Sequence, residues 1–328
     1  MIPRLAIAAL AALPMALPAA AASEVKNGVW SLLVENDLFY GSDRNYTSGV
    51  GLAWVTSPKP PPEWAVRMAR SVPWFPEIGE IRHGYIVGQN MYTPRDIGLV
   101  DPPLDDRPYA GWLYATIGLG VESAGQTDQI AFTIGVIGPA SLAEQSQKAI
   151  HELRGSPEPR GWDTQLANEP GFELAYQRRW RDVAAGTLAG LELDFTPHAG
   201  GALGNVYTYV NAGFTVRYGK RLASDLGPLR IRPSPPGSGF FVPGDAFSWY
   251  VFVGVDGRAV ARNVFLDGNT WRESRSVSRE ALVGDLQWGA AVTWKGARLT
   301  YTHVRRTREF ETQGPSSDFG AIALSVAF

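Results

Sequence analysis

One histidine in this chain stands where an imidazole could do chemistry. Residues 138–168 predict a short helix followed by a turn-rich segment, and His151 lies within that helix. Helical spacing places Glu144 and Gln147 beside it on one polar face. An imidazole can take a proton from water near neutral pH, as the general base of a hydrolase does. A solvated histidine on a surface loop is the alternative interpretation.

The ends of this helix are predicted from local signals. Ser141 followed three residues later by Glu144 has the spacing of a capping box, and Gly155 is a C-terminal stop. The small or apolar residues of the helix form a second stripe, which consists of Ala143, Ser146, Ile150 and Leu153.

Composition narrows the class of protein. Residues 1–22 carry one basic residue, an apolar run and a small-residue end, so they predict a secretory signal peptide followed by one domain over residues 23–328. The chain has no cysteine, which excludes disulfides, thiolate catalysis and cysteine metal sites. A formal net charge of −2 provides no basic field for nucleic acid. No G-x-S-x-G elbow supports a serine esterase.

The elements that would position His151 are strands. Many aromatic residues and glycines lie in alternating segments, as in the stretch Gln129–Val136, and no later apolar run is long enough for a membrane helix. Alternation of this kind in an exported chain predicts an all-β fold, a transmembrane β-barrel of 12 antiparallel strands with a short helix in an extracellular loop. Charged residues on the polar faces are then expected in the lumen, among them Glu173, Glu192 and Asp194. The twelve segments are Val29–Phe39, Tyr46–Thr56, Arg82–Tyr92, Tyr109–Glu122, Gln129–Val136, Phe172–Trp180, Ala189–His198, Val206–Arg217, Phe247–Val255, Leu282–Trp294, Ala297–Arg305 and Ala321–Phe328.

The order of the strands predicts at which rim of the barrel each connection lies. When both termini are periplasmic, every connection from an odd to an even strand is extracellular. Asn36 and Asp37, Thr47, the 92–109 connection and the His151 helix should therefore share one rim, on the outer-leaflet side.

Several blocks together resemble the outer-membrane lipid A 3′-O-deacylase family. They follow one another in order and spacing over most of the chain after residue 22. These blocks are Val34-Glu35-Asn36-Asp37, Asp43 to Gly49, Gln89 to Pro94, Asp106 to Gly111, Gln147 to His151, Gly161-Trp162-Asp163 and Gln165.

The resemblance implies a calcium-dependent esterase that removes the 3′-linked acyloxyacyl group from lipid A in the bacterial outer membrane. His151 would be the general base that activates water, and Gln147 would support the site. Asn36 and Asp37 would belong to the Ca²⁺ and catalytic cluster, with Thr47 beside them. For the Lys that the family carries after the Tyr-x-Pro block, either Arg95 or no residue takes the role here. The acidic residue after the His falls on Pro157 in an ungapped comparison, with Glu158 adjacent.

The expected partners are lipopolysaccharide and the other outer-membrane lipids, with no nucleic acid and a monomeric chain. Two rival functions remain from the sequence: a channel or structural barrel without chemistry, and a barrel phospholipase that uses a Ser–His pair. Only Ser146 and Ser156 could supply such a serine. For Asp37, the structural alternative is a lumenal carboxylate neutralised by Arg44 or Arg107.

Overall fold

The computed structural model describes residues 28–36, 45–57, 62–72, 75–76, 79–123, 125–181, 183–224, 227, 246–314 and 316–328, with the backbone alone at 45–47 and 68–70. The predicted signal peptide and Asp37 lie outside these residues. None of the helices in the described part of the chain is long and apolar enough to cross a membrane.

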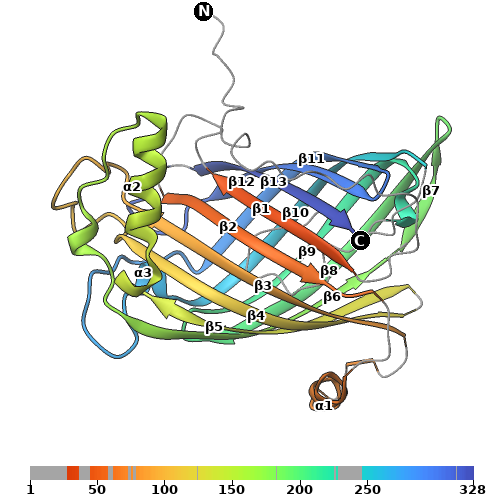
Figure 1. Ribbon diagram of the computed structural model, residues 1–328, viewed down its shortest axis with the longest axis horizontal. Coiled ribbons are helices and arrows are strands. Elements are labelled where there is room, and N and C mark those ends of the chain that lie inside the picture. The colour runs from red at the N-terminus through yellow and green to blue at the C-terminus, as the bar shows by residue number, and fades with distance from the viewer. Residues whose placement is uncertain are drawn as a thin grey trace, which may run out of the picture.

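The structure is a closed antiparallel barrel of 12 strands with one extra strand, as predicted (Figure 1). Closure comes from pairing of β1 with β13 and of β6 with β8. The extra strand, β7, pairs with the part of β8 that β6 leaves free, so it continues the line of β6 around the same wall. The strands are β1 Val29–Asn36, β2 Asn45–Val55, β3 Glu80–Thr93, β4 Ala110–Ser123, β5 Gln126–Ile137, β6 Glu169–Trp180, β7 Ala184–Leu188, β8 Leu191–Gly204, β9 Tyr207–Lys220, β10 Ser248–Asn263, β11 Leu282–Trp294, β12 Ala297–Thr307 and β13 Ser316–Ala327.

Three α-helices lie at the two ends of the barrel. Helices α2 (Ala143–Arg154) and α3 (Val264–Asp267) are at one end, here called the α2 rim, and α1 (Glu63–Arg70) is at the other, the α1 rim (Figure 1). Single-turn 3₁₀ helices cover Pro139–Ser141, Trp162–Thr164 and Leu222–Ser224. Between β11 and β12 the chain reverses at Lys295-Gly296, both with positive φ, which confirms the predicted tight turn.

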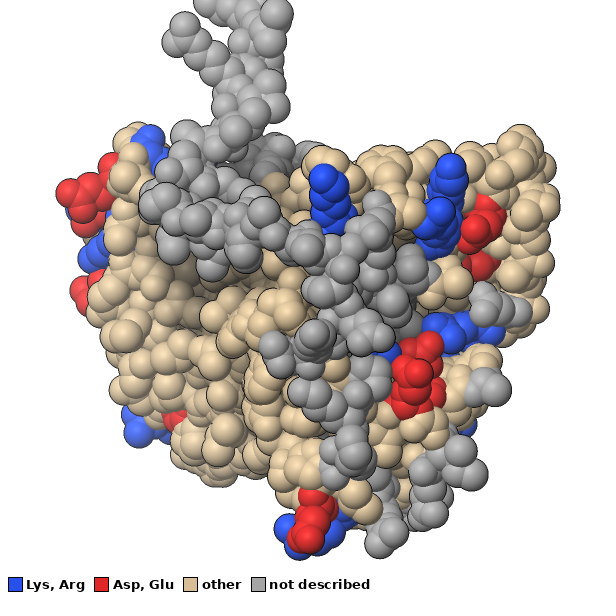
Figure 2. All heavy atoms as spheres, turned by 45° about the vertical axis from the view of Figure 1, so that its right-hand side comes forward, with Lys and Arg blue, Asp and Glu red and all other residues tan. Residues whose placement is uncertain are grey.

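Alternation along the strands separates an apolar outer wall from a polar lumen. Phe132 and Ile134 of β5 are 41% and 56% exposed, whereas Thr133 between them is buried. In the space-filling view much of the wall shows no charged side chain, and the charges gather toward its borders (Figure 2). Near the α1 rim, Trp30, Trp54 and Tyr85 stack along one outward row with centroids 6.0 and 5.6 Å apart, as in the aromatic girdle of a membrane barrel.

At the α2 rim, side chains of the described residues fill the lumen. Phe265 of α3 is fully buried and stacks on Tyr92 at 4.1 Å, beside the buried Trp112. A cavity of about 60 Å³ remains beneath α3, lined in part by Tyr92 and Leu266. Such a volume holds a few water molecules.

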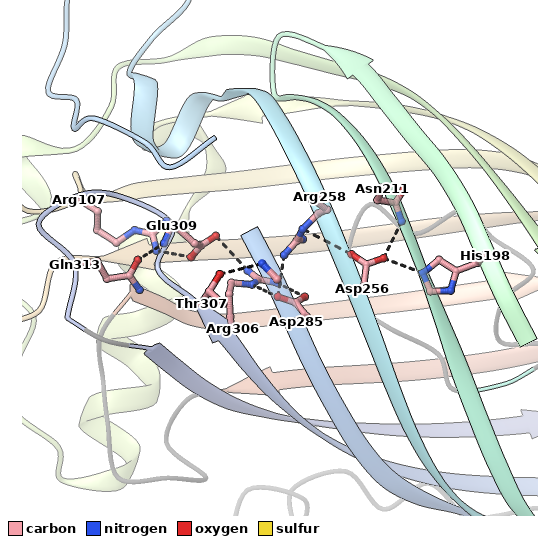
Figure 3. Close-up of polar contacts among 11 residues, drawn as sticks. Arg107, His198, Asn211, Asp256, Arg258, Asp285, Arg306, Thr307, Glu309 and Gln313 are labelled. Carbon is pink, nitrogen blue, oxygen red and sulfur yellow. Dashed lines mark hydrogen bonds and ion pairs between the residues drawn. The ribbon is translucent and has the colours of Figure 1, made fainter. Parts of the chain in front are cut away.

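Beyond α3, polar and charged side chains from five strands and two loops form a network across the lumen (Figure 3). Asp285 accepts hydrogen bonds from both Arg258 and Arg306, at 2.9 Å each. Arg306 also pairs with Glu309 at 3.3 Å, and Asp256 accepts from His198 at 2.9 Å. Interior ion pairs of this kind confirm the lumenal position expected for charged residues.

The three carboxylates singled out from the sequence behave differently from one another. Asp194 is buried and accepts hydrogen bonds from Arg217, and Glu192 accepts from the backbone amide of Leu222 at 2.7 Å. Glu173 is fully buried with no hydrogen-bond partner among the described residues.

Candidate functional site

Helix α2 lies against the outside of the barrel wall, and a glycine makes this contact possible. Gly111 of β4 faces outward, and a Cβ placed there would be 2.1 Å from Ser141 Oγ and 2.3 Å from Ala143 Cβ. The outward-facing Gln89 of β3 donates from Nε2 to the Ser141 carbonyl at 2.7 Å. These contacts fix the start of α2 above β3 and β4.

The start of the helix differs from the sequence prediction. Ser141 ends a 3₁₀ turn and is fully buried, and the residue that caps α2 is Leu142, with φ of 60° and no side-chain cap. The capping-box prediction is therefore wrong. The predicted stop is confirmed, because Gly155 adopts φ of 65° and the amide of Ser156 donates to the His151 carbonyl.

The face of α2 that is buried also differs from the face that its apolar residues predict. Ala143, Gln147 and His151 are 1%, 1% and 4% exposed, whereas Leu153 is 82% exposed. The predicted apolar stripe thus faces away from the wall at its C-terminal half. The solvated imidazole considered from the sequence is excluded, since His151 is buried.

On the exposed side of α2, charged residues pair with one another. Lys148 donates to Glu144 at 2.7 Å, and this hydrogen bond raises the pKa of the Lys148 ammonium group. Glu144 therefore belongs to the solvent face and does not accompany Gln147 and His151 into the buried layer.

The imidazole of His151 is oriented by the chain that follows the helix. Its Nδ1 lies 2.5 Å from the Pro157 carbonyl oxygen, which can only accept, so the proton is on Nδ1. In the neutral ring Nε2 then carries the lone pair. The backbone carbonyl of Pro157 holds the ring at the position where the family resemblance led us to expect an acidic side chain.

Gln147, one helical turn before His151, is held by Trp162. The indole Nε1 donates to Gln147 Oε1 at 2.8 Å, and both side chains are 1% exposed. The Trp162 ring packs on Tyr109 with centroids 4.8 Å apart, and Met91, Ile97 and Ala143 complete this cluster. The sequence indicated Trp162 only as part of a block that resembles the family, and it did not predict the bond to Gln147.

The strand residues predicted for the site lie on the same outer surface. Asn36 is the last residue of β1, and it alternates with Val34 and Leu32 on the outward face. It pairs with Ser48, which pairs with Met91, which pairs with Gly111 beneath α2. With strands about 4.8 Å apart, Asn36 is about 10 Å from Met91 along this row.

Thr47 occupies a β-bulge next to the row. Tyr46 pairs with Tyr92 and Ser48 with Met91, so Thr47 is the extra residue between them. Bulges are common at barrel rims and beside active sites, where they redirect the chain. The structure thus brings Asn36, Thr47, Gln147 and His151 to one rim, and Asp37 follows Asn36 outside the described residues.

The same row continues to the other side of Asn36. Asn36 pairs with Gly320, Gly320 with His303, and His303 with Trp288, all facing outward. His303 stacks on Trp288 at 4.0 Å and its Nε2 lies 2.9 Å from Asp318. The sequence did not predict a His–Asp pair on this part of the outer wall. Asn36 lies near one end of the sequence, whereas His303 and Asp318 lie near the other.

Arg107 and Arg95 take structural positions. Arg107 is fully buried, 3.6 Å from Glu309 and 4.9 Å above the Tyr92 ring, so it lies on the lumen side and cannot reach a lipid headgroup. Arg95 is exposed, and its guanidinium donates to the Thr312 carbonyl at 3.3 Å.

A metal could be held here by oxygen ligands. No group of three or more His, Asp or Glu side chains suited to a metal occurs among the described residues. The described part of the chain contributes the Asn36 amide, a hard oxygen donor of the kind that Ca²⁺ accepts.

Comparisons with known proteins agree with this architecture. A family model described as outer membrane protein LpxR matches residues 5–328. The solved structure of LpxR from Salmonella typhimurium superimposes with a TM-score of 0.74 at 19% identity, covering 92% of this chain and all of that one. The β domain of the Bordetella autotransporter BrkA covers similar lengths at 11% identity, with a TM-score of 0.43. No curated protein matches the chain. The match across nearly the whole sequence shows that the chain belongs to the LpxR family of outer-membrane proteins.

Proposed function

We propose that this protein is a lipid A 3′-O-deacylase, an esterase that acts at the α2 rim on lipopolysaccharide in the outer leaflet. The observation that carries the proposal is a buried imidazole, bonded to the Pro157 carbonyl, on a helix whose start packs against the outer wall of the barrel. A base in that position can reach the ester of a lipid that stays in the membrane. Helix α3 packs into the lumen at this end, where Phe265 stacks on Tyr92, and this favours the outer wall as the place for a lipid substrate.

The connections support one orientation in the membrane. Both ends of the barrel sheet, Val29 and Ala327, pair with each other at the α1 rim, and three connections at this rim are two residues long. Short turns and both termini are features of the periplasmic side of such barrels. These features favour an orientation with the α2 rim toward the outer leaflet, where lipid A resides.

In the proposed mechanism, His151 removes the proton from a water molecule. The hydrogen bond from Nδ1 to Pro157 fixes the tautomer and turns Nε2 into the acceptor of that proton. The water then attacks the ester carbonyl, and the proton passes from Nε2 to the leaving alkoxide. Exclusion of solvent by the Met91–Tyr109–Trp162 cluster keeps this exchange local.

Calcium is the proposed cofactor. Asn36 and Asp37 would supply its oxygen ligands at the end of β1, and the cation would stabilise negative charge on the ester oxygen when bound. Thr47, in the adjacent bulge, would add a polar group to this cluster.

Two observations bear on the rival functions. The aromatic packing of Phe265, Tyr92 and Trp112 across the lumen opposes an open channel. A phospholipase of the Ser–His type needs a serine on the imidazole, whereas His151 Nδ1 bonds to a backbone carbonyl and Ser146 lies on another face of α2. We therefore favour direct activation of water by His151.

The test is the mass of lipid A after incubation with the purified, folded barrel. We expect loss of the 3′ acyloxyacyl group, and no loss with the variants His151→Ala and Asp37→Ala, although both should keep the heat-modifiable migration of a folded barrel. Leu153→Ala, on the exposed face of the same helix, is the matched control and should be fully active. Full activity of His151→Ala would remove His151 from the mechanism, and unchanged lipid A with the unmodified protein would contradict the function itself.

A further inference from the structure

Trp162 makes one polar contact that sets the direction of a neighbouring amide. Its indole Nε1 donates to Gln147 Oε1 at 2.8 Å. Indole nitrogen is a donor only, so the atom of the Gln147 amide that faces it must be the oxygen. The amide nitrogen Nε2 is thereby turned away from Trp162, and the two orientations of the glutamine are no longer equivalent.

Trp162 is itself immobilised. Its ring is packed against Tyr109, whose hydroxyl donates to the Ile97 carbonyl at 3.2 Å. The turn at Gly161 lies close to the Tyr109 ring, since a Cβ on Gly161 would be 2.6 Å from Tyr109 Cε2. The indole therefore presents its N–H to α2 from a rigid base.

The amide nitrogen of Gln147 has no hydrogen-bond acceptor among the described residues, although it is buried. An unsatisfied buried donor costs about 1–3 kcal/mol, and an apolar side chain of similar size would avoid that cost. Gln147 also lies one helical turn from His151, with about 5–6 Å expected between Cβ atoms at this spacing. A donor that is left unpaired beside the general base is suited to an acceptor that arrives with the substrate.

We infer that Trp162 is a positioning residue for the deacylation. It fixes the amide of Gln147 so that Nε2 donates a hydrogen bond to the carbonyl oxygen of the ester. The inference rests on the proposed function, and it adds a role for Trp162 that packing alone does not require. An amide that donates to the developing oxyanion speeds the chemical step more than it strengthens substrate binding.

The test is a double-mutant cycle with Trp162→Phe and Gln147→Met in the full-length barrel, with purified lipid A as substrate. Phe keeps an aromatic ring against Tyr109 and removes only the N–H, and Met keeps the length of Gln without a donor. Trp271→Phe is the matched control, because Trp271 is 59% exposed on a loop at the same rim.

We expect Trp162→Phe to lower kcat on the order of 10-fold with KM nearly unchanged, because a transition-state contact is lost. Gln147→Met should lower kcat at least as much, and the double variant should be no slower than Gln147→Met alone. Trp271→Phe should match the unmodified protein, and all variants should keep heat-modifiable migration.

Two results would overturn the inference while leaving the function intact: a kcat of Trp162→Phe within twofold of the unmodified protein, or effects of the two substitutions that multiply. If the unmodified protein released no acyl chain, the proposed function would fail, and the role of Trp162 would fail with it.

Discussion

Gly111 and Ala143 approach so closely that the outer wall of the barrel and the start of α2 have no room for a side chain between them. A Cβ on Gly111 would lie 2.3 Å from the Ala143 Cβ, below any normal contact distance. Since Ala143 lies on the same helical face as Gln147 and His151, this contact sets how deep both functional side chains sit.

Gly111→Ala is therefore expected to lift α2 from the wall. The backbone of β4 and the start of the helix must separate by roughly 1 Å or more, and a displacement of that size in a catalytic group can cost about 100-fold in rate. The measurement is deacylation rate with heat-modifiable migration as the fold check. Gly186→Ala in β7 is the control, because nothing lies within 4 Å of its Cβ position. Unchanged activity of Gly111→Ala would show that α2 tolerates the shift.

If Asn36 and Asp37 hold the proposed calcium ion, removal of calcium should abolish activity, because the ester oxygen would lose its stabilising cation. We expect no acyl release in excess chelator and full recovery when Ca²⁺ is restored. Asp37→Asn should raise the Ca²⁺ concentration that gives half-maximal activity, since one ligand charge is lost. Activity that persists after chelation, with metal content below the enzyme concentration, would exclude a cation from the reaction.

Phe265→Ala should destabilise the barrel while sparing the reaction. Phe265 is fully buried between Tyr92, Trp112 and Tyr207, and such truncations cost about 3–5 kcal/mol. The denaturant midpoint of unfolding in detergent should fall, whereas deacylation at low temperature should persist, because α3 packs in the lumen and the candidate site is on the outer wall. Phe132→Ala, on the exposed wall, should change the midpoint much less. Loss of activity with an unchanged midpoint would place α3 in the catalytic machinery.

Asp285→Asn should be among the more destabilising substitutions in the lumen. Asp285 is 2% exposed and accepts hydrogen bonds from Arg258 and Arg306. Removal of one partner from a buried ionic cluster costs about 3–5 kcal/mol, and we expect a loss of stability in this range. The unfolding midpoint is again the measurement. Glu152→Gln, exposed on α2, provides a surface carboxylate for comparison. A midpoint equal to that of the unmodified protein would mean that water enters the network and replaces the lost charge.

The sequence by itself determined the barrel. Alternation is a local property, because successive residues of a strand point to opposite faces. It predicted the twelve strands of the barrel, including Leu282–Trp294 with its observed bounds, but not the short extra strand β7. The stop of α2 at Gly155 was also predicted, since a left-handed residue there is a local requirement. Of the site, the resemblance to a family indicated the residues, and barrel topology gave their common rim.

Only the tertiary structure decided which side of α2 is buried and what holds its side chains. Leu153 is exposed and His151 is buried because of the surface that α2 meets. That surface consists of the outward-facing Gly111 and the Met91–Tyr109–Trp162 cluster, and these residues come from positions up to 71 residues apart in the sequence. The lumenal network around Asp285 joins residues that strand register brings together, and the bond from Trp162 to Gln147 depends on how the segment after α2 folds back onto the helix. Hydrophobic periodicity records which residues are apolar, whereas burial depends on the partner surface, and that surface exists only once the barrel has closed.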